Sequence, residues 1–271
     1  DKKFYALRDV TSTVESIPLI TASILSKKLS EGIDALVLDV KFGKGAFMKD
    51  FEQADALAES LVRVGQGAGL KVRALLTNMD APLGRTIGNS LEIIESIDIL
   101  KGEGPQDTTE LTREIGAEML VLGGRATSLD EARALLDESL NSGAALEKFK
   151  EMIKAQGGDP AVVDSPSLLP TADEVVEVHA KRSGWVSGID ALALGTLAMD
   201  LGAGRRKAED SIDHGVGVTL DVRVGSHVQA GDRLGTMHQR ASNKGETSRF
   251  IEAFSWSEDE IKAPKLIEKR L

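Results

Sequence analysis

A short, almost continuous apolar run at residues 34–40 (DALVLDV) restricts the fold of this chain more than any other feature. Such a run is typical of a strand buried on both faces of a parallel sheet. A glycine-rich turn, a helical segment from about residue 51 to 65 and a second strand-like run at 71–78 (KVRALLTN) follow it. This alternation indicates right-handed βαβ units, so the sequence predicts an α/β fold whose parallel or mixed sheet has flanking helices.

Helices are predicted before and after these strands along the sequence. Residues 16–31 read as a helix in which Ser16 caps the start, Pro18 suits the first turn and Gly32 takes the left-handed position after the end. Further helical segments cover 90–100 and most of 108–156, where Ser128 and Glu131 form a capping-box pattern. Three prolines and little periodicity in 157–171 place a domain boundary there.

Beyond residue 171 the chain changes to short strands, interrupted by one helical segment at 189–202. The turn spacing VGS…AGD at 224–232 resembles that of small barrel-sandwich domains. No lysine stands at the tip of the relevant hairpin, which disfavours a swinging-arm carrier. We therefore expect a smaller α+β barrel-sandwich domain at 161–271, an α/β portion at 32–160, and at 1–31 the remnant of a separate α-domain.

Composition excludes several classes of function. The 33 basic and 43 acidic residues give a net charge of −10, which argues against a nucleic-acid partner. Cysteine is absent, so thiolate metal sites and cysteine nucleophiles are excluded, and a reducing compartment such as the cytoplasm fits. No apolar run is long enough to span a membrane. The chain starts at Asp1 without a signal-like segment, and we expect it to be part of a longer protein.

Two polar side chains on the first helix are candidates for ligand binding. Ser23 and Lys27 are four residues apart and project from one helix face, with Arg8 upstream of them. An arginine, a serine and a lysine directed at one point suit an acceptor-rich ligand that gains negative charge. The alternative, favoured by spacing alone, is that Lys27 belongs to a solvated helix face.

Other candidate positions are weaker. The turns KFGKGAFM and APLGRTIGN follow predicted strands, where open α/β sheets bind ligands, but neither matches a phosphate-loop or dinucleotide pattern. Glu95 lies one helical stretch beyond Leu83 and Thr86, and it either joins their backbone oxygens around a cation or is an ordinary exposed helix residue. The four histidines lack metal-ligand spacing, and we assign them no catalytic role.

Longer stretches carry a resemblance to a known family. Several segments show this resemblance: the run from YALRDVTSTVESIPLITASILSKKLSEG to GKGAFM, the segments LLTNMDAPLGRTIGNSLEI and LKGEGPQDTTELT, and the tail VHAKRSGWVSGIDA with GVGVTLDVRVGSHVQAGD. They are similar to the pyrimidine nucleoside phosphorylases, which include thymidine phosphorylase. The resemblance runs in order along nearly the whole chain. It implies reversible phosphorolysis of a pyrimidine nucleoside to free base and pentose 1-phosphate, with phosphate as co-substrate and no organic cofactor.

The resemblance also implies roles for individual residues. Arg8 and Lys27 are the expected catalytic residues, and they bind the base together with Ser23. Ile20 and Ile24 line the wall beside C5, and Phe47 closes the pocket; core packing is the alternative for these three. A potassium ion is expected at the backbone oxygens of Leu83 and Thr86 and the carboxylate of Glu95, although Thr86 replaces a smaller residue.

In the family, the phosphate site and most of the α-domain lie upstream of the part that this chain matches. The resemblance therefore implies that the chain alone is inactive and that the full-length enzyme is a homodimer. Two alternatives stay open. One is a related phosphoribosyltransferase, which lacks a tail like the one that begins near Ala172. The other is a separately encoded base-binding or assembly subunit without catalytic activity.

Overall fold

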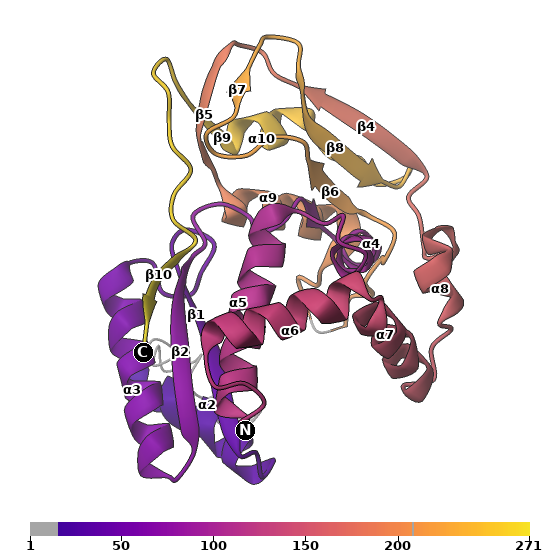
Figure 1. Cartoon of the computed structure of the whole chain (residues 1–271). Coiled ribbons are helices and arrows are strands. Elements are labelled where there is room, and N and C mark those ends of the chain that lie inside the picture. The colour runs from indigo at the N-terminus through magenta and orange to yellow at the C-terminus, as the bar shows by residue number, and fades with distance from the viewer. Residues whose placement is uncertain (1–15, 208) are drawn as a thin grey trace. The chain divides into compact units, whose positions relative to one another are not determined.

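The computed structural model describes residues 16–207 and 209–271, and the elements are labelled in Figure 1. They form two compact units. The first contains the chain up to Asn78, Leu111–Leu136 and Lys265–Leu271, and the second contains Met79–Glu110 and Asp137–Pro264. The expected division into domains at 1–31, 32–160 and 161–271 stays a prediction, as does the assignment of the first helix to a separate α-domain.

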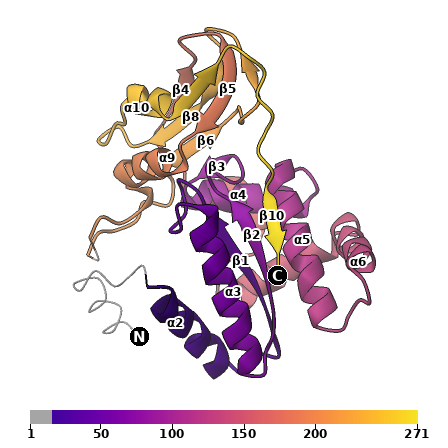
Figure 2. The ribbon, with the colours of Figure 1, turned by 90° about the vertical axis from the view of Figure 1, so that its left-hand side faces the viewer.

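The first unit is built on a mixed sheet of order β1-β2-β10 (Figure 2). Strands β1 (Ala35–Phe42) and β2 (Lys71–Asn78) are parallel, and helix α3 (Phe51–Gly67) connects them. The predicted βαβ unit is therefore confirmed. The last strand, β10 (Ile267–Arg270), adds to β2 in the antiparallel direction, which the sequence did not lead us to expect.

Helix α3 covers one face of this sheet. The Asp50 carboxylate caps its start by accepting a hydrogen bond from the Gln53 backbone N–H at 2.8 Å. Leu57 and Leu61 on α3 pack against Ala74 and Leu76, two alternate residues of β2 that share one sheet face. The apolar stripe of α3 thus forms the core of this unit.

Helix α2 (Ile17–Ser30) packs against α3 through Leu25, which is 2% exposed, and through a buried hydrogen bond from Thr21 Oγ1 to Ser60 Oγ at 3.0 Å. Gly32 follows the helix with φ of 69°, as predicted. The predicted cap is wrong: Ser16 makes no side-chain capping bond, and only its carbonyl accepts from the backbone N–H of Ile20.

The opposite face of β2 carries a cluster of ion pairs. Arg73 of β2 pairs with Glu118, and Arg270 of β10 donates to Glu118 at 2.9 Å and to Glu114 at 2.6 Å. Arg133 donates to both carboxylate oxygens of Glu114 at 2.7 Å. The two glutamates are almost fully buried, so these bonds satisfy carboxylates that would otherwise be unpaired. The glutamates lie on α5 (Gln106–Leu122), and Arg133 lies on α6 (Leu129–Asn141).

The capping box at the start of α6 forms only in part. The Ser128 hydroxyl accepts from the Glu131 backbone N–H at 3.2 Å, as predicted. The Glu131 carboxylate instead takes its bonds from Thr127, at 2.8 Å from the backbone N–H and 2.6 Å from the hydroxyl. The hydrogen bonds at this helix start are thus shared with the residue before the cap.

The second unit contains two antiparallel sheets, of order β3-β6-β8-β4 and β7-β5-β9. Its core joins strand residues such as Val218, Leu234 and Val186 to Leu194 and Phe250 of two helices. The predicted change to a tail of short strands is confirmed, and these strands pair in the antiparallel direction. The strands are β3 (Thr86–Ile87), β4 (Glu174–His179), β5 (Gly184–Ile189), β6 (Gly217–Leu220), β7 (His227–Val228), β8 (Arg233–Gln239) and β9 (Phe254–Ser257).

The helices of the second unit follow the predicted segments with a few additions. Residues 157–171 are not wholly irregular, because two short helical turns interrupt them. The helix near the C-terminus and strands β9 and β10 were missed. In the described part of the chain, no helix is both long and apolar enough to cross a membrane. The helical elements are α4 (Asn89–Leu100), α7 (Ala144–Ala155), α8 (Ala161–Asp164), η1 (Pro166–Leu168), α9 (Ala191–Ala198), the π-helical turn η2 (Met199–Ala203) and α10 (Thr247–Glu252).

Candidate functional site

One face of α2 lines a cavity of about 400 Å³ in the first unit. Ile20, Ser23, Ile24 and Lys27 follow one another at spacings of three, one and three residues, so they share that face. Lys27 Nζ lies 3.4 Å from Ser23 Oγ, which places the ammonium and the hydroxyl side by side at the cavity wall. Apolar residues of β1 and α3 complete the wall: Leu38, Val40, Leu57 and Leu61.

The carboxyl end of β1 adds a second polar group to the same cavity. Lys41 Nζ lies 2.7 Å from Asp39 Oδ2 and donates to Thr77 Oγ1 at 3.2 Å. The Thr77 hydroxyl donates to Asp39 Oδ1 at 2.5 Å. Parallel strands end at the same sheet edge, and this is why Asp39 and Lys41 on β1 meet Thr77 on β2.

The turn after β1 brings Phe47 to the cavity. Gly43, with φ of 112°, starts the turn, and its N–H donates to the carbonyl of Met48 at 3.0 Å. The backbone thus folds back on the strand end, and both Phe47 and Met48 line the cavity. Phe47 is 55% exposed, so it stands at the mouth of the cavity, in contrast to the buried Met48.

The charges of this cavity favour a ligand with acceptor groups. Its described lining carries two ammonium groups, on Lys27 and Lys41, and one carboxylate, on Asp39. Asp39 is paired with Lys41, and the ammonium of Lys27 lies beside Ser23 on the α2 side of the same cavity. A flat ligand with a polar edge fits such a surface, and charge that develops on that edge would be stabilised by the lysine.

The expected cation ligands lie in the second unit, around the turn that precedes β3. Glu95 on α4 accepts from the Arg85 backbone N–H at 2.7 Å, and its carboxylate stands over Gly84, where a Cβ would be 2.1 Å from Oε1. Asp107 accepts from the Gly84 N–H at 3.2 Å and pairs with Arg223. The turn is thus held between two carboxylates.

The electrostatics of this turn favour an added positive charge. Burial raises the pKa of Glu95, although the bond from the Arg85 N–H opposes it, and the nearby Asp107 carboxylate raises the pKa further. The guanidinium of Arg223 pairs with Asp107 and partly offsets the effect of that carboxylate on Glu95. Among the described residues, no group of three or more histidine and acidic side chains is placed to hold a metal.

The structure thus brings the predicted base-site residues of the described chain together at one cavity: Ile20, Ser23, Ile24, Lys27 and Phe47. Arg8 lies outside the described residues. The predicted cation ligands Leu83, Thr86 and Glu95 belong to the other unit. Asp39 was missed; the signal for it was a charged residue inside an apolar strand at the sheet edge where ligands bind.

Two protein-family models match this chain. The family model described as the a/b domain of a glycosyl transferase family matches residues 1–146, and the pyrimidine nucleoside phosphorylase C-terminal domain matches residues 185–253. The chain belongs to the pyrimidine nucleoside phosphorylase family. The family resemblance predicted from sequence motifs is therefore confirmed, and the two domain models match successive parts of the chain.

Individual pyrimidine nucleoside phosphorylases match along the same range. The pyrimidine-nucleoside phosphorylases of Staphylococcus aureus strains USA300 and NCTC 8325 are each 50% identical over 269 residues, and that of the bovine strain RF122 is 49% identical. Each alignment covers 99% of this chain and 62% of the relative. The chain thus spans less than two thirds of the length of the curated relatives that it matches.

Proposed function

We propose that this chain forms the pyrimidine-binding part of an enzyme that cleaves pyrimidine nucleosides with phosphate to free base and pentose 1-phosphate. The observation that supports the proposal most is the cavity in which Lys27 and Ser23 lie beside an apolar wall. The relatives that match 99% of the chain are named pyrimidine-nucleoside phosphorylases, and a base with an acceptor-rich edge fits this lining.

The role of Lys27 follows from the charge that the reaction creates. When the glycosidic bond breaks, the base leaves with the bonding electrons and becomes negative, while the sugar becomes oxocarbenium-like. A fixed ammonium stabilises the departing base more than the neutral nucleoside, so it accelerates the chemical step. Ser23 orients the polar edge of the ring, and Ile20 and Ile24 contact its apolar edge. Arg8, expected to assist Lys27, is assigned from the family resemblance alone.

The chain alone is proposed to be inactive, because the family resemblance assigns the phosphate-binding loop to a segment outside this sequence. The test is a phosphorolysis assay with thymidine and with uridine. No base should be released by the 271-residue chain with phosphate, and release should appear when the matching N-terminal portion of a family member is added. Turnover by the chain alone would contradict this proposal. Base binding without turnover in the mixture would instead favour a non-catalytic subunit.

We also propose that a potassium ion binds at the turn beside Glu95. The backbone oxygens of Leu83 and Thr86 and the Glu95 carboxylate would hold it, and the two carboxylates beside the turn, Glu95 and Asp107, support the assignment. Oxygen ligands suit a hard cation. Potassium chloride should raise the melting temperature of the chain more than tetramethylammonium chloride at equal ionic strength, and Glu95→Gln should abolish the difference. Equal stabilisation by both salts would contradict the site.

A homodimeric state and a cytoplasmic location remain proposals, and both rest on the family resemblance. Sedimentation of the mixture described above tests the first, with a dimer expected. A broad uridine and thymidine preference and a strict thymidine preference are both compatible with the proposed function, because such selectivity depends on small differences in pocket contacts.

A further inference from the structure

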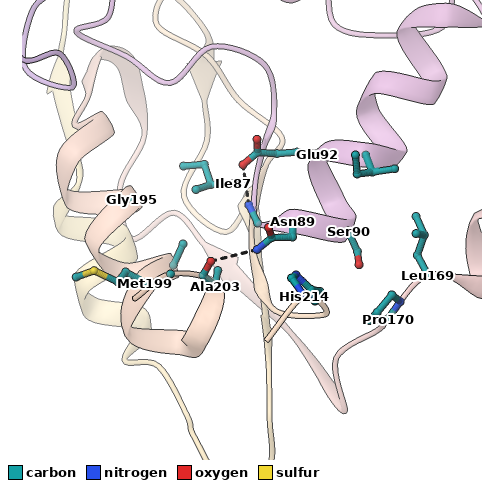
Figure 3. A pocket seen from close by; sticks show the side chains of 14 residues that line it. Ile87, Asn89, Ser90, Glu92, Leu169, Pro170, Gly195, Met199, Ala203 and His214 are labelled. Carbon is teal, nitrogen blue, oxygen red and sulfur yellow. Dashed lines mark hydrogen bonds between the residues drawn. The ribbon is translucent and has the colours of Figure 1, made fainter. Parts of the chain in front are cut away.

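A second cavity, of about 620 Å³, lies in the second unit and plays no part in the proposed reaction (Figure 3). Helix α9 and the turn η2 form one side, and the start of α4 with the segment at Leu169 and Pro170 forms the other. Its walls are mainly apolar, and its volume is in the range of small-molecule sites.

The hydroxyl of a largely buried serine faces this cavity. Ser90 is 4% exposed, and its backbone N–H donates to the carbonyl of His214 at 3.0 Å. Its side-chain oxygen makes no hydrogen bond with any described residue, and Figure 3 shows the hydroxyl directed into the space near His214 and Pro170. Because the Ser90 hydroxyl is directed into the cavity, it is available to bond a ligand there.

A glycine keeps the opposite wall open. Gly195 lies inside α9, where glycine destabilises a helix by about 1 kcal/mol relative to alanine. Neither backbone nor packing requires it there, because its φ is not positive and a Cβ would meet no atom within 4 Å. That Cβ would enter the cavity, so the glycine adds to the open volume.

The backbone next to Gly195 is also irregular. Helix α9 continues into the π-helical turn Met199–Ala203, in which Gly202 has φ of 113°. Both Met199 and Ala203 line the cavity, and the Asn89 side-chain amide fixes the turn by donating to the carbonyl of Ala203 at 3.1 Å. Such π-helical turns occur frequently at functional sites.

We propose that this cavity is a second binding site, independent of the proposed reaction, for a neutral planar heterocycle of nucleobase size. The apolar walls contact the ring faces, and Ser90 bonds one polar edge. Glu92 disfavours anions, because its carboxylate, which accepts from the Gly88 N–H at 3.0 Å, belongs to the cavity lining. The imidazole of His214, which lies near the Ser90 hydroxyl, can bond the same edge of the ring, and the second oxygen of Glu92 can bond a different edge.

The test is calorimetric titration of the 271-residue chain with adenine, and with benzoate as a planar anion of similar size. Adenine should bind at least tenfold more tightly than benzoate. Gly195→Leu fills the cavity from a helix position that has room for a side chain, and it should weaken adenine binding at least tenfold. The matched control is Gly67→Leu in the exposed last turn of α3, where a Cβ also meets nothing, and it should leave the affinity unchanged.

Ser90→Ala removes the buried hydroxyl and should weaken adenine binding about threefold to tenfold, the range for one hydrogen bond. Equal adenine affinity in the wild type and Gly195→Leu would place the binding elsewhere and overturn the proposal. No binding of adenine or benzimidazole at about 10 mM would also overturn it. Tighter binding of benzoate than adenine would show an anion site, contrary to the proposal.

Discussion

Lys41 Nζ lies 2.7 Å from Asp39 Oδ2, and both side chains line the cavity to which Lys27 contributes. The pair holds Lys41 at the sheet edge, and Lys27 lies on the α2 side of the same cavity. In the proposed reaction Lys27 therefore faces the base, and the bonds of Asp39 to Lys41 and Thr77 make it a structural part of the wall.

Replacing Asp39 tests this structural role. Asp39→Ala should lower the free energy of unfolding by about 1–3 kcal/mol, because the fully buried Thr77 hydroxyl loses its acceptor and Lys41 loses its carboxylate. Urea denaturation measures the change. Asp34→Ala, on an exposed residue just before β1, is the matched control and should change stability by less than about 0.5 kcal/mol. Equal changes in unfolding free energy for the two variants would show that the Asp39 bonds do not stabilise the protein.

The buried glutamates of α5 predict a specific pH dependence. Hydrogen bonds from Arg133, and secondarily from Arg270, hold the pKa of Glu114 below its ordinary value of 4.5. A carboxyl whose pKa is lowered by folding stabilises the protein fully above its unfolded pKa, and this contribution is lost as the pH falls through the lowered value. Glu114→Gln should therefore cost about 2–3 kcal/mol near neutral pH and progressively less below pH ~4.5.

Urea denaturation between pH ~3 and 8 tests this pattern. The difference in the free energy of unfolding between wild type and Glu114→Gln should be constant near neutral pH and should become smaller in acid. Glu147→Gln is the control, because its carboxylate on α7 is exposed and its ion pair with Lys150 is at the surface. A difference in unfolding free energy that stays constant to the lowest pH would show that the charge of Glu114 does not cause the stabilisation.

Replacing Gly195 should stabilise the protein, in contrast to the substitutions above. Gly195→Ala should raise the free energy of unfolding by about 0.5–1 kcal/mol, because alanine is the better helix former and nothing obstructs its methyl group. Thermal unfolding measures the gain. Destabilisation would mean that the cavity wall at α9 is closer packed than the structure shows.

The sequence predicted the elements whose signal is local. The apolar run at 71–78 is the strand Lys71–Asn78, and the helix expected at 16–31 extends over Ile17–Ser30. Side chains that share a helix face are set by spacing alone, so Ser23 and Lys27 were correctly placed together. These parts need no information from distant segments.

The missed parts depend on contacts between distant segments. Strand β10 is a short, charged stretch (IEKR), and it becomes a strand only because β2 offers an edge and Glu114 and Glu118 pair with Arg270. Asp39 gained significance only when Thr77, 38 residues away, was placed beside it. The cavity beside Ser90 joins α4 to segments more than 75 residues further along the chain, and no local pattern signals it.

The measurement that tests the central claim most directly compares Lys27→Ala with Lys28→Ala in the mixture of this chain and the family's N-terminal portion. The two lysines are neighbours on α2, but Lys27 lines the cavity, whereas Lys28 pairs with Glu31 outside it. For thymidine phosphorolysis, Lys27→Ala should lower kcat about 10²–10³-fold, and Lys28→Ala should leave it within about twofold of wild type. Equal kcat values for both variants and wild type would contradict the claim that this cavity stabilises the departing base.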